Sequence, residues 1–442
     1  MKVALITLGC PKNLVDAETM LGLLDEAGHR LVASPDGADV AIVNTCGFIA
    51  AAIEESAGVI AECLALKEAG RLGAVLVAGC LPQRFGGVHP AIPPGVDGVV
   101  GSASYGRIVE ALESMRRGVP PAIIEEPADP HDEDAPRILG TPAHLAYVKI
   151  AEGCDNRCSY CTIPDIRGPL RSRPPDAIAR EVSSLVAAGI KEVNLIAQDT
   201  TAYGTDIAFG EGLAGLVDVL AETGAPWIRI LYTHPAHVTR ALLDVMANHP
   251  NVVPYIDVPV QHVADRILDA MGRRIDGAGV RALLAAIRET VEGVAIRSTI
   301  IAGFPGETEG EFLELLELVE EGAFDHLGIF EYSPEPGTPA AALPGPVDRD
   351  VARARAILLA DAMENLTHAA GAALVGSTVR VLVDGGGPAP AGRTTRQAWE
   401  TDGVVLLPGA ALTVGEFADV EITEAAGFDL VGRPVVEDGR SR

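Results

Sequence analysis

The chain has 442 residues, enough for two to four domains. Asp and Glu total 61 against 34 Lys and Arg, and the resulting formal charge of -27 repels phosphate backbones and anionic membranes but attracts basic partners. Seven cysteines are too sparse for a disulfide scaffold, and no run of about 18 apolar residues predicts a membrane span. Composition therefore argues against a secreted disulfide-rich domain and a membrane protein, and favours a cytoplasmic protein whose cysteines act as ligands.

The first part of the chain, residues 1–118, alternates short apolar runs with helical patterns, which is typical of a parallel α/β domain. The expected strands are 3–8, 39–43 and 74–78, and the expected helices are 17–27 and 50–69. A segment rich in Pro and acidic residues, 119–142, predicts a linker.

A second alternating series occupies residues 143–373 and closes with a long helix at 348–370. Its six expected strands are 145–150, 192–196, 228–232, 253–258, 294–301 and 326–331. Six β/α units are too few for a closed eight-stranded barrel, so we expect an open, partial (β/α)6 barrel of the TIM type. Residues 374–442 have short strands and Gly-rich turns, which predict a small all-β barrel.

The strongest motif is the group Cys154, Cys158 and Cys161, which directly follows the first strand of the partial barrel. Soft thiolates select zinc, Cu(I) or iron–sulfur clusters. A structural zinc site or an ordinary cluster needs four ligands, and no fourth cysteine lies nearby. Three cysteines would leave one iron of a cluster open for chemistry, at the rim where barrel enzymes place their active sites.

A second group, Cys10, Cys46 and Cys80, is dispersed in sequence, but each cysteine lies just past the carboxyl end of an expected strand. Parallel strands bring these ends to one edge of a sheet, so we expect the three thiols to converge on a shared metal site. The alternative is that each is a small apolar filler. Cys63 lies within an expected apolar helix, and we interpret it as a core thiol.

The spacing C-x3-C-x2-C, with Tyr160 before the last cysteine, resembles the signature of the radical S-adenosylmethionine superfamily. Two three-cysteine groups in this order, followed by a β-barrel tail, are similar to the methylthiotransferases of that superfamily over nearly the whole chain. The resemblance implies a 4Fe-4S cluster at each group, S-adenosylmethionine on the open iron of the second cluster, and a TRAM domain as the tail. It also implies that Tyr160, Gln198, Gly303 and Pro305 contact the cofactor, and it assigns no general acid or base.

Two loops are similar to the family branch that modifies a ribosomal protein: 198–204 (Gln-Asp-Thr-Thr-Ala-Tyr-Gly) and 259–262 (Pro-Val-Gln-His). The tail run 398–403 is also similar, with Trp399 in place of the usual Pro. In that branch a methylthio group is added to the β-carbon of an aspartate on the twelfth protein of the small ribosomal subunit. The resemblance implies this basic protein as partner, free or on the ribosome, and a reducing electron donor such as flavodoxin or ferredoxin.

Two alternatives remain open at this point. A tRNA methylthiotransferase acting on a modified adenosine would need a basic surface, whereas residues 374–442 hold six Arg, no Lys and ten Asp plus Glu. This balance makes tRNA an unlikely partner. A non-catalytic, zinc-stabilised binding module would need a fourth ligand beside Cys161, which the sequence lacks.

Overall fold

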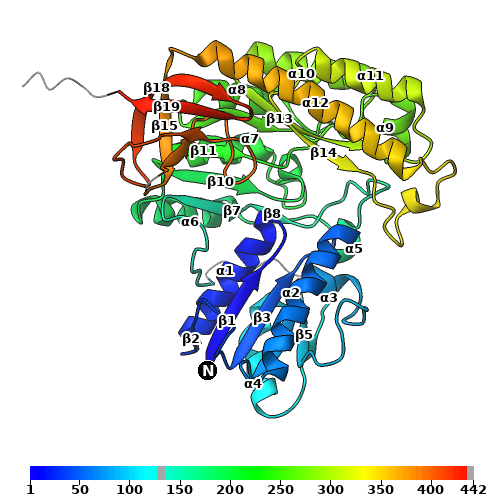
Figure 1. The fold of residues 1–442 in the computed structure, drawn as a ribbon, viewed down its shortest axis with the longest axis vertical. Helices are drawn as coiled ribbons and strands as arrows, with labels where there is room; N and C mark the ends of the chain where they lie inside the picture. Colours follow the sequence, from blue (N-terminus) through cyan, green and yellow to red (C-terminus); the bar gives the residue numbers. More distant parts are fainter. Residues whose placement is uncertain (128–134, 388, 436–442) are drawn as a thin grey trace, which may run out of the picture.

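The computed structural model describes residues 1–127, 135–387 and 389–435. The described chain forms a parallel α/β domain, a larger central α/β domain and a small β-barrel (Figure 1). The sequence-based fold class is thereby confirmed. No helix in the described ranges is both long and apolar enough to cross a bilayer.

The N-terminal domain is a six-stranded, all-parallel sheet in the order β2-β1-β3-β4-β5-β6. Helices α1 and α4 bury Met20 and Leu112 against one face, and α2 and α3 bury Ile60 and Leu81 against the other. Cys63 is 2% exposed in this second core, which confirms it as a core thiol. The elements are β1 (Lys2–Thr7), α1 (Pro11–Glu26), β2 (Arg30–Leu31), β3 (Val40–Thr45), α2 (Ala50–Glu68), β4 (Ala74–Gly79), α3 (Cys80–Arg84), β5 (Gly98–Gly101), α4 (Ile108–Arg116) and β6 (Ala122–Ile123).

Helix α1 begins six residues earlier than the apolar periodicity predicts. Its first turns contain polar residues that are nevertheless buried, among them Lys12, Asn13 and Asp16. Hydrophobic periodicity detects only apolar buried faces, so a polar face buried between domains is invisible to it. Pro11 at the first helical position is a start signal that agrees with the observed boundary. The short strand β6 lies within the segment interpreted as a linker.

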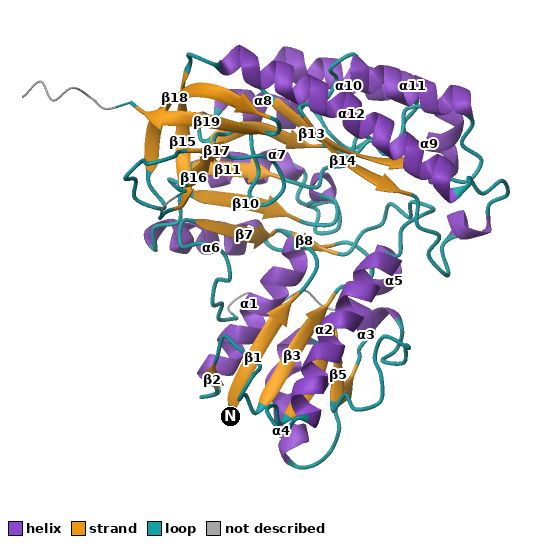
Figure 2. Ribbon diagram, viewed as in Figure 1, coloured by secondary structure: helices purple, strands orange, loops and turns teal. Residues whose placement is uncertain are grey.

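The central domain is a second six-stranded parallel sheet, in the order β14-β13-β12-β11-β10-β7. The first and last strands do not pair with each other, so the barrel is open as expected. Helices cover the convex outer face of the sheet (Figure 2). The elements are β7 (Leu145–Lys149), β8 (Ala151–Glu152), α5 (Ile163–Arg167), β9 (Arg171–Ser172), α6 (Pro175–Ala187), β10 (Glu192–Ile196), α7 (Gly212–Ala221), β11 (Trp227–Ile230), α8 (Arg240–Asn248), β12 (Val252–Asp257), α9 (Asp265–Met271), α10 (Gly277–Thr290), β13 (Ala295–Ala302), α11 (Glu309–Glu320), β14 (His326–Glu331) and α12 (Arg349–Leu374).

The tail is a closed five-stranded barrel, with order β15-β16-β17-β19-β18, around a small core that includes Val381 and Val420. It packs on the central domain through buried aromatic and ionic contacts, including the edge-on pair Trp227–Phe417 at 4.9 Å between ring centroids. Its strands are β15 (Thr378–Gly385), β16 (Ala391–Arg393), β17 (Val405–Leu406), β18 (Phe417–Ala426) and β19 (Asp429–Pro434).

The carboxyl ends of the N-terminal strands face the central domain. The arrowheads of β1 and β3 point toward it in Figure 2. The loops that carry Cys10, Cys46 and Cys80 therefore lie at the interface between the two α/β domains.

Candidate functional site

The dispersed cysteines converge, as the sheet topology predicts. Cys10 is the N-cap of α1, Cys46 follows β3 and Cys80 begins α3. Gly9 has φ +90, and a Cβ there would lie 2.9 Å from Cys46 Cβ. A Cβ on Gly47 would lie 2.9 Å from the backbone oxygen of Cys80. The three loops touch, and these two glycines permit the contact.

Asn13, which the sequence analysis missed, ties two of these loops together. Its Nδ2 donates hydrogen bonds to the backbone oxygen of Leu8 at 2.8 Å and to that of Thr45 at 3.2 Å. These carbonyls lie shortly before Cys10 and Cys46. The amide thus fixes both loops relative to α1. The sequence signal that could have identified Asn13 is its position in the first turn of a helix, three residues after the candidate ligand Cys10.

Burial and repulsion from neighbouring thiols oppose ionisation of Cys46 and Cys80. Burial is the largest cause of the raised pKa of Cys46 and raises the pKa of Cys80 to about 12, and the neighbouring thiols add to both shifts. Arg167 acts in the opposite direction. A cationic metal centre stabilises such thiols as thiolates, since metal binding displaces their protons.

The local trio, Cys154, Cys158 and Cys161, lies in the loop between β8 and α5. Burial raises the pKa of Cys154 to about 11 and that of Cys161 to about 12, with the other thiols of the loop as further causes. The backbone N–H of Ile163 donates to Cys161 Sγ at 3.4 Å. Hydrogen bonds of this kind stabilise thiolate ligands and tune a cluster's potential.

Arg273 connects the loop of the local trio to another loop of the central domain. Its Nη1 donates to Cys158 Sγ at 3.5 Å and to Tyr160 Oη at 3.4 Å, while its Nη2 donates to the backbone oxygen of Pro259. The guanidinium is buried, so its positive charge acts on the thiols with little screening by solvent. No sequence pattern pointed to this arginine, which lies 115 residues beyond Cys158.

Both trios are too widely spaced for a single zinc ion. Among the described residues, only Asp199, His234 and His237 form a set of three potential ligands whose atoms all lie within 4.8 Å of one another. Tetrahedral zinc with Zn–S bonds of about 2.3 Å would draw its sulfurs to roughly 3.8 Å apart. Three soft donors at wider spacing suit a polynuclear iron–sulfur cluster, so the residues present fit that group.

The two trios occupy adjoining loops of one interdomain interface. Thr162, next to Cys161, donates from Oγ1 to the backbone oxygen of Phe48, two residues after Cys46, at 3.4 Å. Arg84 and Glu335 form an ion pair at 2.9 Å across the interface, with side chains 5% and 3% exposed. These contacts bring the cysteine loops of two domains together in one site.

A buried polar network also connects the trios. Arg167 donates from Nη2 to Cys80 Sγ at 3.2 Å, and from Nη1 to Asp16 Oδ2 at 2.7 Å and Glu152 Oε2 at 3.1 Å. Glu152 lies two residues before Cys154. It also accepts from Gln198 Nε2. Arg167 thus links a ligand of one trio to the loop of the other.

The structure places the four residues expected to contact the cofactor around the local trio. Tyr160 packs with Phe304 beside Arg273, and Pro305 is buried at the end of β13. Gln198 Oε1 is buried without a described hydrogen-bond partner, so it is available to a ligand. Gly303 also has a packing role. A Cβ there would lie 2.4 Å from Ala352 Cβ, so this glycine admits helix α12.

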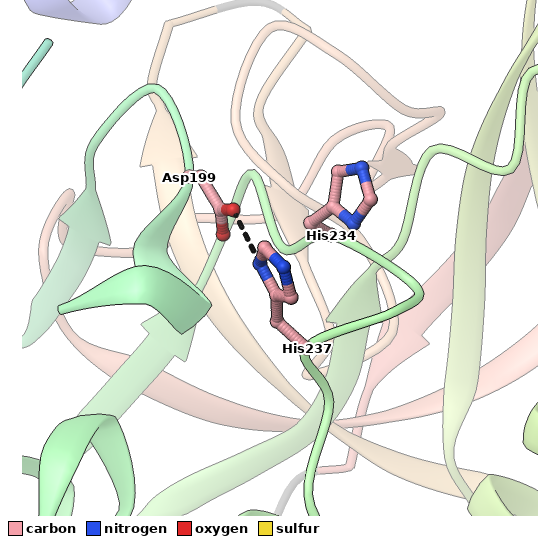
Figure 3. A group of neighbouring side chains, drawn as sticks. All are labelled: Asp199, His234 and His237. Carbon is pink, nitrogen blue, oxygen red and sulfur yellow. Dashed lines mark hydrogen bonds and ion pairs between the residues drawn. The ribbon is translucent and has the colours of Figure 1, made fainter. Parts of the chain in front are cut away.

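Asp199, His234 and His237 form a group that the sequence analysis did not single out (Figure 3). Asp199 Oδ2 makes hydrogen bonds of 2.8 Å with His237 Nδ1 and 2.7 Å with Asn156 Nδ2, and Asn156 belongs to the local cysteine loop. The carboxylate is thus already used in holding these side chains. His234 Nε2 is buried without a described partner, and burial, reinforced by Arg273, lowers the pKa of His234 to about 3. His234 is therefore a neutral imidazole available to a ligand.

Comparisons with known families agree with this three-part architecture. Residues 2–101 match the Uncharacterized protein family UPF0004, residues 148–319 the Radical SAM superfamily, and residues 375–435 the TRAM domain.

Curated proteins similar to this chain over nearly its full length include several named ribosomal protein uS12 methylthiotransferase RimO. The protein from Anaeromyxobacter sp. (strain K) is 44% identical over 99% of this chain and 94% of its own length. Those of Heliobacterium modesticaldum and Geobacter sulfurreducens are 43% and 42% identical, over 99% and 98% of this chain and 96% and 98% of their own lengths.

Solved structures share the fold at low identity. The radical S-adenosylmethionine methyltransferase TsrM from Kitasatospora setae, with cobalamin and a 4Fe-4S cluster bound, has a TM-score of 0.56 at 16% identity, over 77% of this chain and 73% of that one. The cobalamin-dependent radical enzyme OxsB has a TM-score of 0.53 at 12% identity, over 82% of this chain and 56% of that one.

Proposed function

The chain belongs to the RimO family of ribosomal protein uS12 methylthiotransferases, and we propose that it adds a methylthio group to the β-carbon of an aspartate in that ribosomal protein. It is a radical S-adenosylmethionine transferase that uses two 4Fe-4S clusters. The observation that carries the proposal is the meeting of two three-cysteine groups, from two domains, at one interface.

We assign Cys154, Cys158 and Cys161 to the cluster that works with S-adenosylmethionine, and Cys10, Cys46 and Cys80 to the auxiliary cluster. When bound, these groups supply the hydrogen-atom abstraction, the methyl group and the sulfur. Each four-iron cluster would be bound by three cysteines, which leaves one iron of each cluster open to a non-protein ligand.

The protein's own residues hold and shield this site. Arg273 and the Ile163 N–H stabilise charge on the thiolates of the local trio. The Arg84–Glu335 pair fixes the N-terminal domain over the central one and excludes water from the interface. Gln198 Oε1 and His234 Nε2 are buried polar atoms available to bind cofactor or substrate, and we place S-adenosylmethionine beside Tyr160, Gln198, Gly303 and Pro305.

The described tail favours a protein substrate over tRNA. Each of its four arginines is engaged: Arg393 with Asp384 and Glu192, Arg396 with Asp325, Arg433 with Glu421, and Arg380 over the ring of Phe417. Phosphate contacts by unpaired Lys and Arg dominate nucleic-acid affinity. A tail without free cations in its described part, on a chain of charge -27, suits a basic ribosomal protein. We place the reaction in the cytoplasm, with a low-potential donor such as flavodoxin or ferredoxin.

The test is mass spectrometry of ribosomal proteins and tRNA from cells that lack this protein. We expect uS12 to lose its methylthio group at one aspartate, and a plasmid copy to restore it. Loss of a methylthiolated adenosine from tRNA, with uS12 unchanged, would contradict the substrate assignment. Zinc without iron in anaerobically purified protein would contradict the enzyme assignment.

A further inference from the structure

Lys12 extends from the N-terminal domain into the mouth of the partial barrel. It is the second residue of α1 and lies two residues after Cys10. Its side chain crosses the interface, and Nζ lies 3.0 Å from the ring centroid of Tyr232, just beyond the carboxyl end of β11. The residue is only 7% exposed. The ammonium thus lies where the two domains meet, beside the auxiliary trio.

Unlike Lys149 and Arg167, the Lys12 ammonium has no anionic partner among the described residues. Lys149 and Arg167 each form ion pairs with Asp16 and Glu152. For Lys12, the described residues provide the face of the Tyr232 ring and neither an ion pair nor a hydrogen bond to Nζ. Buried charges in proteins are normally paired, because desolvation of an isolated ammonium is costly. An ammonium held at this interface without a described ion pair is suited to bind an anion that is not part of the chain.

Cys10, Asp257 and Glu152 lie close enough to attract the Lys12 ammonium, but no ion pair with any of them is described. A carboxylate that binds beside Nζ would supply the missing counter-charge.

The backbone of Tyr232 supports a functional origin for this arrangement. Tyr232 has φ +60, a left-handed conformation that is unfavourable for a bulky residue. Its N–H donates to Asp257 Oδ2 at 2.9 Å, which holds the strained turn at the end of β11. Strain of this kind is unfavourable and concentrates at ligand-binding sites. Here it places the aromatic ring under the ammonium.

We propose that Lys12 binds the side-chain carboxylate of the target aspartate and thereby determines that an aspartate is modified. This inference rests on the proposed function, which makes the substrate a β-carboxylate beside the reacting carbon. A carboxylate held by Lys12 lies between the loop of Cys10 and the barrel residues Tyr232 and Asp257, so its neighbouring β-carbon is presented where the two domains meet. A neutral amide of the same shape would leave the buried ammonium uncompensated.

The experiment is a binding comparison with two fluorescent peptides from the uS12 loop, one with the target aspartate and one with asparagine in its place. Affinities are measured by anisotropy with anaerobic, fully iron-loaded protein and S-adenosylmethionine. Wild-type protein should prefer the aspartate peptide by about tenfold to a hundredfold, as expected for a buried hydrogen bond between charged groups. Lys12→Met should abolish the preference, and Lys12→Arg should retain most of it.

Lys191→Met is the matched control. Lys191 contacts the tail, where its Nζ lies 3.8 Å from Glu416 Oε1, away from both trios. It should keep the wild-type preference. A Lys12→Met protein that still prefers aspartate would overturn the inference. So would an equal loss of affinity for both peptides together with lost iron, which would show that the ammonium serves the thiolates of the auxiliary trio instead. Failure of the wild-type protein to modify the aspartate peptide, with methylthiolation of tRNA, would refute the proposed function itself.

Discussion

The two cysteine trios reach the same interface by different routes. Cys154, Cys158 and Cys161 lie within eight residues, in one loop after one strand. Cys10, Cys46 and Cys80 come from the ends of three parallel strands, and they meet only because the sheet is formed and Gly9 and Gly47 let the loops touch. The first site is encoded locally and the second by topology. The local trio should therefore tolerate disturbance of the N-terminal sheet, whereas the dispersed trio should not.

The largest expected effects come from removing each trio in turn. Wild-type protein purified without air should carry about eight irons, from two four-iron clusters. Alanine at Cys154, Cys158 and Cys161 should remove about four irons and abolish cleavage of S-adenosylmethionine. Alanine at Cys10, Cys46 and Cys80 should remove the other four and abolish methylthiolation, yet leave slow cofactor cleavage. Cys63→Ala should change neither iron content nor cleavage. Loss of cleavage in the N-terminal variant would show that the sites are not separable.

Gly9→Ala tests whether the dispersed trio depends on loop contact. Its Cβ would lie 2.9 Å from Cys46 Cβ, in a left-handed conformation with φ +90. Gly28→Ala is a matched control, since Gly28 has φ +77 but nothing within 4 Å of an added Cβ. Both variants carry backbone strain of about 1 kcal/mol, but only Gly9→Ala should lose iron, about four per chain. Equal iron content in the two proteins would contradict the convergence of these loops.

Arg167→Met tests the link between the trios. It removes one of two cations that face the buried carboxylates of Asp16 and Glu152. Because Lys149 still forms ion pairs with both carboxylates, we expect the free energy of unfolding to fall by about 3 kcal/mol, near the lower end of the range for a broken buried ion pair. The measurement is chemical denaturation of the anaerobic protein. Arg107→Met, which breaks exposed pairs with Glu110 and Glu125, should leave the midpoint unchanged. Arg167→Met with a wild-type midpoint would show that the network adds nothing to stability.

The smallest expected effect is a pH dependence at His234. Its pKa is lowered to about 3 in the folded protein, from an ordinary value of 6.5, mainly by burial. Between these two pH values His234 is protonated in the unfolded chain but not in the folded one. The stability contributed by the neutral imidazole is therefore complete above pH 6.5, and the free energy of unfolding falls by about 1.4 kcal/mol per pH unit below it. His234→Gln should flatten the slope measured by denaturation between pH 5 and 7. The exposed His368→Gln should not, and an unchanged slope in His234→Gln would contradict a buried neutral imidazole.

Periodicity was enough to predict the fold class, with an open six-stranded barrel, because it depends on buried apolar runs. Strand ends were enough to predict that the loops of Cys10, Cys46 and Cys80 lie at one edge of the N-terminal sheet. The polar partners were not predictable. Arg167 lies 151 residues from Asp16, and no local pattern announces such a pair. The tail shows the same limit. Asp402 counts among its acidic residues, yet it is buried against the central domain, where its carboxylate accepts a 2.7 Å hydrogen bond from Tyr255. A count of charged residues does not show which of them have a buried partner.

Whether both trios act on the β-carbon of one aspartate can be measured by anaerobic turnover of a uS12 loop peptide whose target aspartate carries deuterium at that carbon. The peptide and the nucleoside are then analysed by mass spectrometry. We expect deuterium to appear in 5'-deoxyadenosine and the peptide to gain one methylthio group in place of one deuterium. A methylthiolated peptide that retains all its deuterium, or deuterium-free 5'-deoxyadenosine beside an unmodified peptide and a modified tRNA, would contradict it.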